Sequence, residues 1–267
     1  MPFADNHGVR LHWREEGQGS PILLVMGHRY SSAMWYPILP ALAAEHRVIS
    51  FDNRGTGESD ATRKASIGEL AGDALAVMDA AKVERAHVFG VSMGGVVSLE
   101  LAMQQPGRVT SLLLGCTGVL TADKPRMPAA LRVLYYLPSW ALRALQPRGD
   151  RGYGSAASRE EIAEALAMLA KDKFNTGGVV AQAAAIAGYS TTTAAVAALT
   201  MPALVLHGDE DSTVPFAYGV ELAETLPDSR LVTLEGAGHN FIVAGNAKAT
   251  KAVLDFIREV DQAAAKP

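Results

Sequence analysis

The sequence predicts an α/β protein in which helices cover both faces of a mostly parallel sheet. Short apolar runs alternate along the chain with segments whose apolar residues recur at helical spacing, which is the pattern of β-α-β units. One run, Ile-Leu-Leu-Val-Met at residues 22–26, is entirely apolar, as expected of a central parallel strand buried on both faces. The alternation stops over residues 117–198, where no strand-like run occurs. We therefore expect a doubly wound sheet that carries a helical insertion.

Most of the sheet is expected from the first half of the chain. Residues 9–15 are expected to form an early strand that pairs in a hairpin with residues near Phe3. The remaining strands of this half are expected at residues 22–26, 48–52, 86–89 and 112–114, and the helices between them at residues 33–44, 67–80 and 96–104. This alternation favours parallel pairing, because a helix must carry the chain back before the next strand begins.

The insertion and the C-terminal part complete the order of elements. Helices are expected in the insertion at residues 128–145, 159–171 and 178–189, with a glycine-rich loop at residues 148–154. The alternation then resumes with a strand at residues 203–206, a helix at 217–225, a strand at 231–234 and a helix at 246–261. The predicted domain division is a core of residues 1–116 and 199–267 with a helical cap, or lid, of residues 117–198.

Length and composition limit the function classes. The chain has 267 residues, of which 49% are hydrophobic and 19% are charged, which is ordinary for a folded enzyme and excludes a disordered chain. The net charge of −4, without a cluster of lysine and arginine, argues against a nucleic-acid partner. The N-terminus lacks the pattern of a signal peptide, and the apolar stretches at residues 86–103 and 181–206 are interrupted by Glu100 and Pro202. A cytoplasmic protein without a membrane partner is therefore expected.

Cysteine usage points away from disulfides and metals. The single cysteine, Cys116, excludes an intrachain disulfide and has no metal-ligand spacing around it. We expect Cys116 to be a small core residue at the end of a strand, and we expect neither a metal nor a cofactor.

A serine between two glycines is the most informative feature of the chain. Gly90-Val91-Ser92-Met93-Gly94 has the spacing Gly-x-Ser-x-Gly and stands between an apolar run and a helical pattern. Such a strand-to-helix turn strains the serine backbone and raises its hydroxyl above the sheet, and the glycines are needed because a Cβ would collide with the neighbouring strand and helix. The helix start also directs N–H groups and a positive dipole end toward the reacting group. We therefore predict that Ser92 is a nucleophile and that the Met93 N–H is one donor to the resulting oxyanion.

Two loops near the C-terminus carry the partners that a nucleophilic serine requires. A base must remove the hydroxyl proton, and a third group must fix the tautomer of that base. Both partners are expected just after strands, in the loops at residues 207–215 and 235–240. The candidates are the acids Asp209, Glu210 and Asp211 in the first loop and the base His239 in the second. His207, at the end of a strand, is expected to form a structural hydrogen bond and not to act as the base. The chain order serine, acid, histidine is that of hydrolases built on doubly wound sheets.

With these residues in place, the chain resembles the α/β-hydrolase fold family over essentially its full length. The resemblance rests on Met26-Gly27-His28, on the segment Asp-Asn-Arg-Gly-Thr-Gly-Glu-Ser at residues 52–59, on the Ser92 elbow and on the Asp211 and His239 loops. It implies a triad of Ser92, Asp211 and His239, with Asp211 favoured because the family's acid stands three residues after a glycine. The family pattern also places the second oxyanion donor on the backbone N–H of His28. Relatives with an aspartate nucleophile, the haloalkane dehalogenases and epoxide hydrolases, are disfavoured because a serine holds that position.

The resemblance implies a cofactor-free serine hydrolase that cleaves small-molecule carboxylic esters or lactones through an acyl-enzyme. Tyr136 and Trp140 in the insertion would then favour an apolar acyl or alcohol group of the substrate. Aromatic residues at such positions are equally expected to form the cap's own hydrophobic core. Arg29, next to His28, either faces solvent or anchors an acidic group of the substrate. Rival functions are a haloperoxidase or perhydrolase, a C–C bond hydrolase of ring-cleavage products, and a small-molecule receptor of the same fold. The sequence predicts neither the physiological substrate nor the oligomeric state.

Overall fold

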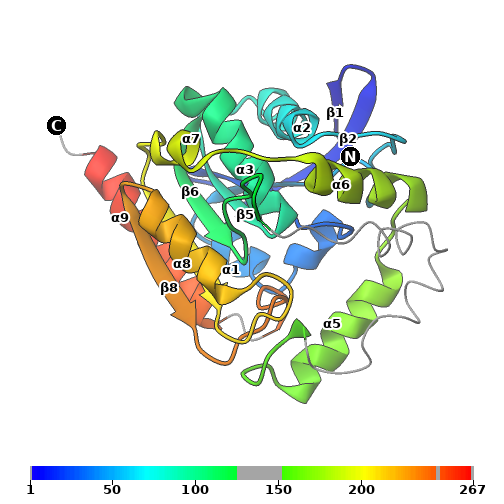
Figure 1. Ribbon diagram of the computed structural model, residues 1–267. Coiled ribbons are helices and arrows are strands. Elements are labelled where there is room, and N and C mark those ends of the chain that lie inside the picture. The colour runs from blue at the N-terminus through cyan, green and yellow to red at the C-terminus, as the bar shows by residue number, and fades with distance from the viewer. Residues whose placement is uncertain (1, 125–151, 245–246, 266–267) are drawn as a thin grey trace.

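One sheet crosses the molecule, and helices cover both of its faces (Figure 1). The computed structural model describes residues 2–124, 152–244 and 247–265. Within these ranges eight strands form a sheet of order β1-β2-β4-β3-β5-β6-β7-β8. The strands are β1 (Phe3–Asn6), β2 (Val9–Glu16), β3 (Pro21–Val25), β4 (Arg47–Phe51), β5 (Ala86–Val91), β6 (Val109–Gly115), β7 (Ala203–Gly208) and β8 (Ser229–Leu234). β2 pairs antiparallel with β1 and with β4, whereas the other neighbouring strands are parallel, so the predicted hairpin and mostly parallel sheet are confirmed.

The helices connect the parallel strands. They are η1 (Ser32–Trp35), α1 (Leu39–Ala43), α2 (Ile67–Ala80), α3 (Met93–Gln104), η2 (Pro106–Arg108), α5 (Arg159–Lys171), α6 (Thr176–Gly188), α7 (Thr193–Ala197), α8 (Phe216–Thr225) and α9 (Ala247–Ala264). Capping boxes of Ser66 with Glu69 and of Ser158 with Glu161 define the starts of α2 and α5. No helix in the described ranges is long and apolar enough to cross a membrane. The expected cytoplasmic location stays a prediction.

The helix predicted at residues 33–44 is wrong as a single element. The structure has a short 3₁₀ helix, η1, and a separate helix, α1. Pro37 lies between them, and because proline has no N–H it cannot continue the helical hydrogen-bond ladder. Pro40 instead stands in the first turn of α1, where the missing N–H has no partner to lose. The two prolines therefore divide a segment whose apolar spacing suggested one helix.

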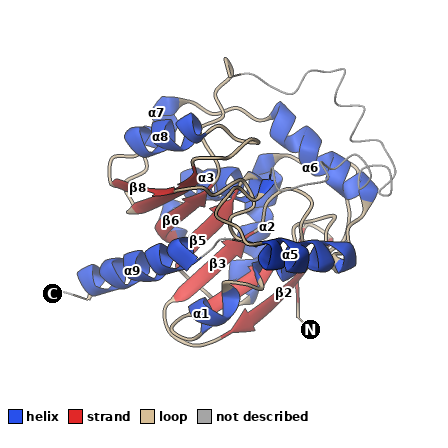
Figure 2. Ribbon diagram, turned by 90° about the horizontal axis from the view of Figure 1, so that it is seen from below, coloured by secondary structure: helices blue, strands red, loops and turns tan. Residues whose placement is uncertain are grey.

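Two hydrophobic cores lie on opposite faces of the sheet. Along β3, Leu23 and Val25 belong to one core and Ile22 and Leu24 to the other, because successive side chains of a strand point to opposite faces. The first core contains the buried residues of α2, α3 and α8, and the second contains those of α1 and α9 (Figure 2). Burial on both sides explains why this central strand is entirely apolar.

The insertion, residues 117–198, leaves the sheet after β6 and returns to it at β7. Its described part contains α5, α6 and α7 and none of the named strands. The helix predicted at residues 159–171 has the bounds of α5, and the helix predicted at residues 178–189 corresponds to α6, which begins two residues earlier, at Thr176. The helix predicted at residues 128–145, with Tyr136 and Trp140, lies outside the described residues.

Helix α6 is fixed to the turn that follows β4. The Asn175 N–H, at the start of α6, donates to the Gly55 C=O at 2.8 Å. A Cβ added to Gly178 would lie only 2.4 Å from the Cα of Gly55, so the helix and the turn are in direct backbone contact. This contact requires glycine on both sides, and it sets the position of α6 relative to the sheet.

Candidate active site

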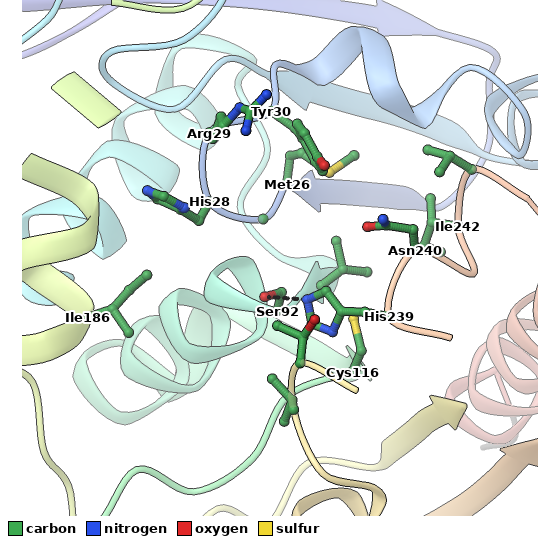
Figure 3. A pocket seen from close by; sticks show the side chains of 15 residues that line it. Met26, His28, Arg29, Tyr30, Ser92, Cys116, Ile186, His239, Asn240 and Ile242 are labelled. Atoms are coloured by element: carbon green, nitrogen blue, oxygen red, sulfur yellow. Dashed lines mark hydrogen bonds between the residues drawn. The ribbon is translucent and has the colours of Figure 1, made fainter. Parts of the chain in front are cut away.

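The loops that follow β3, β5, β7 and β8 meet at one edge of the sheet (Figure 3). Parallel strands place their carboxyl ends at the same edge, which is where open α/β sheets bind ligands. Ser92 follows β5, Asp211 lies in the loop after β7, and His239 lies in the loop after β8. Ser92 and His239, which are 147 positions apart in the chain, are hydrogen-bonded to each other. The topology of the sheet therefore brings Ser92, Asp211 and His239 together.

Ser92 occupies a strained turn between β5 and α3. Its backbone has φ 54° and ψ −120°, a conformation that residues other than glycine rarely adopt. A Cβ on Gly90 would lie 2.2 Å from the Gly94 carbonyl oxygen, and a Cβ on Gly94 would lie 2.0 Å from the Val25 carbonyl oxygen. The predicted steric need for both glycines is therefore confirmed. Strain of this kind costs about 1–3 kcal/mol per residue and persists only where the surrounding structure enforces it.

A chain of hydrogen bonds connects Ser92 to Asp211 through His239. His239 Nδ1 lies 2.8 Å from Asp211 Oδ2, and His239 Nε2 lies 3.0 Å from Ser92 Oγ. Because a carboxylate only accepts, Nδ1 carries the proton of the neutral ring and Nε2 accepts from the serine hydroxyl. The imidazole is thus held in the tautomer that can take a proton from Ser92. We call this arrangement the relay.

Electrostatics in the relay favour an ionised acid beside a basic ring. Burial would raise the pKa of Asp211, but hydrogen bonds from His207 and His239 outweigh it and hold this pKa well below its usual range. Burial would also lower the pKa of His239, yet the Cys116 sulfur and the Asp211 carboxylate beside the ring raise it above its ordinary value. Asp211 is therefore a carboxylate that stabilises an imidazolium, as an orienting acid must be.

Asp211 is the acid of its loop that contacts His239. Asp209 is exposed, and its carboxylate accepts a backbone N–H of the neighbouring loop at 2.7 Å. Glu210 is also exposed and accepts a backbone N–H of the insertion at 2.8 Å. His207 Nε2 donates to a backbone carbonyl at 3.0 Å, in keeping with a structural role. Of the three acids that the sequence offered, Asp211 is therefore the one placed to orient His239.

The turn after β3 passes beside Ser92. A Cβ added to Gly27 would lie 3.3 Å from the Ser92 Cβ, and His28 lines the same cavity as Ser92. On the other side of the serine, Met93 is the first residue of α3. The His28 ring is turned away to donate from Nε2 to the Val179 C=O at 3.0 Å, and burial lowers its pKa. The two residues predicted to supply oxyanion donors therefore flank Ser92.

Arg29 lies in the cavity wall. Its guanidinium carbon is 5.2 Å from the centre of the Phe174 ring and 5.9 Å from that of Tyr30, and the side chain is half-buried. Such stacking on two aromatic rings restricts the positions that a guanidinium can adopt. Arg29 lines the same cavity as Ser92, and its expected role as an anchor for an acidic group of the substrate stays a prediction.

Two cavities meet at Ser92. The first has a volume of about 420 Å³ and is lined by residues that include His28, Arg29, Tyr30, His239, Asn240 and Ile242. The second has a volume of about 400 Å³ and is lined by residues that include Met93, Val96, Thr117, Leu120, Pro215 and Tyr218. Ser92, Ile186, Thr213 and Val214 line both. The serine therefore stands where two mostly apolar cavities meet, each large enough for part of a small molecule.

Comparison with known proteins identifies the family of this chain. The family described as the alpha/beta hydrolase fold matches residues 20–245. The chain belongs to the α/β hydrolase family. Fold and family are thus those that the sequence motifs indicated.

Relatives of this α/β hydrolase act in several hydrolytic reactions. A protein of Azorhizobium caulinodans named for carbamate hydrolysis, RutD, is 31% identical over 98% of this chain and 100% of its own. A thermophilic esterase from Thermogutta terrifontis superposes with a TM-score of 0.86 at 26% identity, over 97% of this chain and 98% of the esterase. The enol-lactonase of Burkholderia xenovorans LB400 gives a TM-score of 0.83 at 27% identity, over 96% of this chain and 100% of the lactonase. These likenesses support hydrolase activity, while the bond that is cleaved differs among the relatives.

Cys116 lies closer to the relay than the sequence suggested. In this α/β hydrolase it follows β6 directly, has a positive φ of 41°, is buried and lines the first cavity beside His239 (Figure 3). Within the described residues, Cys116, Asp211 and His239 offer ligand atoms within 4.8 Å of one another. Asp211 and His239 are already hydrogen-bonded to each other, so we assign no metal to this group.

Two side chains of the insertion that sequence reasoning missed contact the turn after β3. Gln182 is fully buried and accepts a hydrogen bond from the Arg29 N–H at 2.9 Å. The Asp172 carboxylate accepts one from the Ser31 N–H at 3.0 Å. Gln182 is the single polar side chain in the helical stretch at residues 178–188, and this isolation was its signal in the sequence. Asp172, among other charged residues, had no such signal.

Proposed function

We propose that this α/β hydrolase is a serine hydrolase that cleaves carboxylic esters or lactones of small molecules through an acyl-enzyme. The observation that carries the proposal is the relay, in which Ser92 Oγ lies 3.0 Å from His239 Nε2 and His239 Nδ1 lies 2.8 Å from Asp211 Oδ2. A serine in a strained elbow with an ordered base and acid is the arrangement that activates a hydroxyl for acyl transfer. The relatives named as an esterase and a lactonase support the same chemistry.

Each relay residue has one task in the proposed reaction. His239 Nε2 takes the hydroxyl proton as Ser92 Oγ bonds to the carbonyl carbon, and Asp211 stabilises the imidazolium that forms. The backbone N–H groups of Met93 and His28 hold the oxyanion. His239 then gives the proton to the alcohol oxygen as the ester bond breaks, which leaves the acyl group on Ser92. Water attacks this ester by the same steps and releases the acid.

The two cavities suggest how the substrate divides. The departing alcohol must receive its proton from His239, and His239 lines the first cavity, so we place the alcohol part there. The acyl part then enters the second cavity, between Val96, Leu120 and Tyr218. Arg29 in the wall of the first cavity would pair with an acidic group on the departing part.

We further propose that residues 117–198 act as a cap over a core formed by residues 1–116 and 199–267. Helix α6 supports this division, because its residue Ile186 lines both cavities. Tyr136 and Trp140 would add apolar contacts to the substrate from the cap.

A carbamate is the first alternative substrate. Its carbonyl can be attacked by the same serine, and a relative is named for carbamate hydrolysis. The same machinery could also cleave a C–C bond beside a carbonyl, or pass its acyl group to peroxide as a perhydrolase does. A complete relay argues against a receptor that only binds, since binding alone needs no activated hydroxyl.

A substrate panel tests the proposal. Wild-type protein and Ser92→Ala would be assayed on aryl esters from acetate to decanoate, on lactones, on an aryl carbamate and on a ring-cleavage product, each with and without peroxide. We expect turnover of esters or lactones by the wild type only, with no requirement for peroxide. Faster turnover of the carbamate or the ring-cleavage product would reassign the substrate class. Binding without turnover of any substrate would support the receptor.

A further inference from the structure

The turn that contains His28 and Arg29 is hydrogen-bonded to residues of the insertion. Three hydrogen bonds join it to the insertion: His28 Nε2 with the Val179 C=O at 3.0 Å, the Arg29 N–H with Gln182 Oε1 at 2.9 Å, and the Ser31 N–H with Asp172 Oδ2 at 3.0 Å. Of these contacts, the one to Gln182 is made by the backbone of Arg29, the residue after the proposed oxyanion donor His28. The conformation of the turn therefore depends on the position of α6.

Gln182 can make its contact in one orientation only. Its side chain has no exposed surface, and its Nε2 donates to the Arg54 C=O at 2.8 Å. Because that carbonyl only accepts, the amide nitrogen must face Arg54 and the amide oxygen must face the Arg29 N–H. The contact between Gly55 and Gly178 fixes α6 one turn earlier, so the amide cannot move without moving the helix.

The backbone of Arg29 needs such support. Its φ of 77° lies in the left-handed region, which is costly for a residue with a Cβ. The peptide that joins His28 to Arg29 is planar, so its C=O points opposite to its N–H. Since the N–H is held by Gln182, the His28 carbonyl must point away from α6. A rotated peptide would instead leave the Gln182 oxygen buried without a donor, at a cost of about 1–3 kcal/mol.

We propose that Gln182 is a positioning residue that holds the His28–Arg29 peptide in the orientation in which this turn stabilises the oxyanion. The proposal rests on the function proposed above, and it makes a buried amide of the cap part of the machinery for transition-state stabilisation. Loss of one oxyanion donor typically costs about 10²–10³ in kcat. A misplaced turn keeps the Met93 donor, so we expect a loss of about 10- to 100-fold in kcat with KM within about threefold, because the ground-state carbonyl gains little from the donors.

The test compares two conservative changes at α6. Gln182→Met keeps the shape of the side chain and removes both hydrogen bonds. Tyr189→Phe is the control, because it removes the hydrogen bond from Tyr189 Oη to Glu100 Oε2 (2.7 Å) directly after the helix and does not touch the turn. For both variants we would measure kcat and KM on the best ester and Ki for a trifluoromethyl ketone, whose carbonyl becomes an oxyanion when Ser92 adds to it. We expect Ki to rise in proportion to the loss of kcat in Gln182→Met and both to stay unchanged in Tyr189→Phe.

Several results would overturn the inference. A folded Gln182→Met variant with wild-type kcat and Ki would show that the amide does not act on the oxyanion, and a rise in KM alone would limit it to substrate binding. Should Gln182→Met fail to fold by circular dichroism, Gln182→Asn replaces it, since the shorter amide cannot span Arg29 and Arg54, and the same losses are expected. A wild-type protein that neither hydrolyses an ester nor binds the ketone would refute the proposed function itself, and the inference with it.

Discussion

Replacing Asp211 with asparagine should reverse the tautomer of His239. Asp211 Oδ1 accepts the backbone N–H groups of Thr213 at 2.8 Å and Val214 at 2.9 Å, while Oδ2 accepts His239 Nδ1 at 2.8 Å. In Asp211→Asn the amide oxygen must stay on the two N–H groups, so the NH₂ group is forced toward Nδ1. Nδ1 must then accept, the ring proton moves to Nε2, and Nε2 can no longer take the proton of Ser92.

This wrong tautomer should cost up to about 10⁴ in kcat, or about 5.4 kcal/mol of transition-state stabilisation at 1.36 kcal/mol per factor of ten. Asp209→Asn is the matched control, since Asp209 is exposed and its Oδ1 accepts one backbone N–H that an asparagine oxygen can also accept. A surface change of this kind is worth at most about 0.5 kcal/mol, which is about twofold in rate. The assay is kcat on an aryl ester, with active sites counted by the initial burst. Equal losses in the two variants, or a larger loss in Asp209→Asn, would refute the reasoning.

The pH profile of kcat/KM gives an independent check of the same contact. The pKa of His239 is raised, so the protonated and inactive ring persists to higher pH than for a free histidine. Activity should therefore rise with pH through a midpoint above about 6.5, and Asp211→Asn should move this midpoint to lower pH because the carboxylate that stabilises the imidazolium is gone. A midpoint that stayed in place after the substitution would contradict this account of the electrostatics.

Three further predictions concern other parts of the structure. Arg29→Ala should lower kcat/KM about 10- to 100-fold on esters that carry an acidic group and leave neutral esters nearly unchanged, and equal losses on both would assign Arg29 to the turn alone. Gly94→Ala should lower the free energy of unfolding in urea by at least about 1–3 kcal/mol, because the new Cβ would lie 2.0 Å from the Val25 carbonyl oxygen. Gly107→Ala is the control and should change this free energy little, because its Cβ would have no heavy atom within 4 Å outside the neighbouring residues of the chain. Asp73→Ala should cost about 3–5 kcal/mol of unfolding free energy, because it removes the carboxylate to which the buried Arg54 guanidinium donates twice at 2.6 Å and leaves it the more distant Glu69 carboxylate at 3.9 Å. A loss below about 1 kcal/mol would mean that water or Glu69 replaces the Asp73 carboxylate.

The fold is predictable from the sequence where local signals are dictated by steric contact or burial. β3 is identified because burial on both faces demands an apolar residue at every position. The elbow is identified because Gly90 and Gly94 touch backbone where no Cβ fits. The segment at residues 33–44 fails by the same logic, since its apolar spacing indicates one helix but Pro37 removes the N–H that would continue it.

The candidate site is predictable only as far as topology determines it. Ser92, Asp211 and His239 each lie just after a parallel strand. The strand order therefore suffices to predict that they meet at the edge formed by the carboxyl ends of the strands. Gln182 and Cys116 depend on contacts between segments that are distant in sequence: the packing of α6 on the turn after β3, and the place where β6 ends beside the loop after β8. A local pattern can mark Gln182 as an isolated polar residue, but it does not identify the partner of either residue. The substrate contacts proposed for Tyr136 and Trp140 stay predictions.

Labelling with an organophosphonate tests the central claim most directly. The reagent reacts with a serine only where a base activates it and an oxyanion site stabilises the product. Mass spectrometry of the digested wild-type protein should find one phosphonyl group, on the peptide that contains Ser92, and Ser92→Ala should remain unlabelled while keeping the wild-type circular dichroism spectrum. A phosphonyl group on another residue, or labelling that persists in Ser92→Ala, would contradict the assignment of Ser92 as the nucleophile.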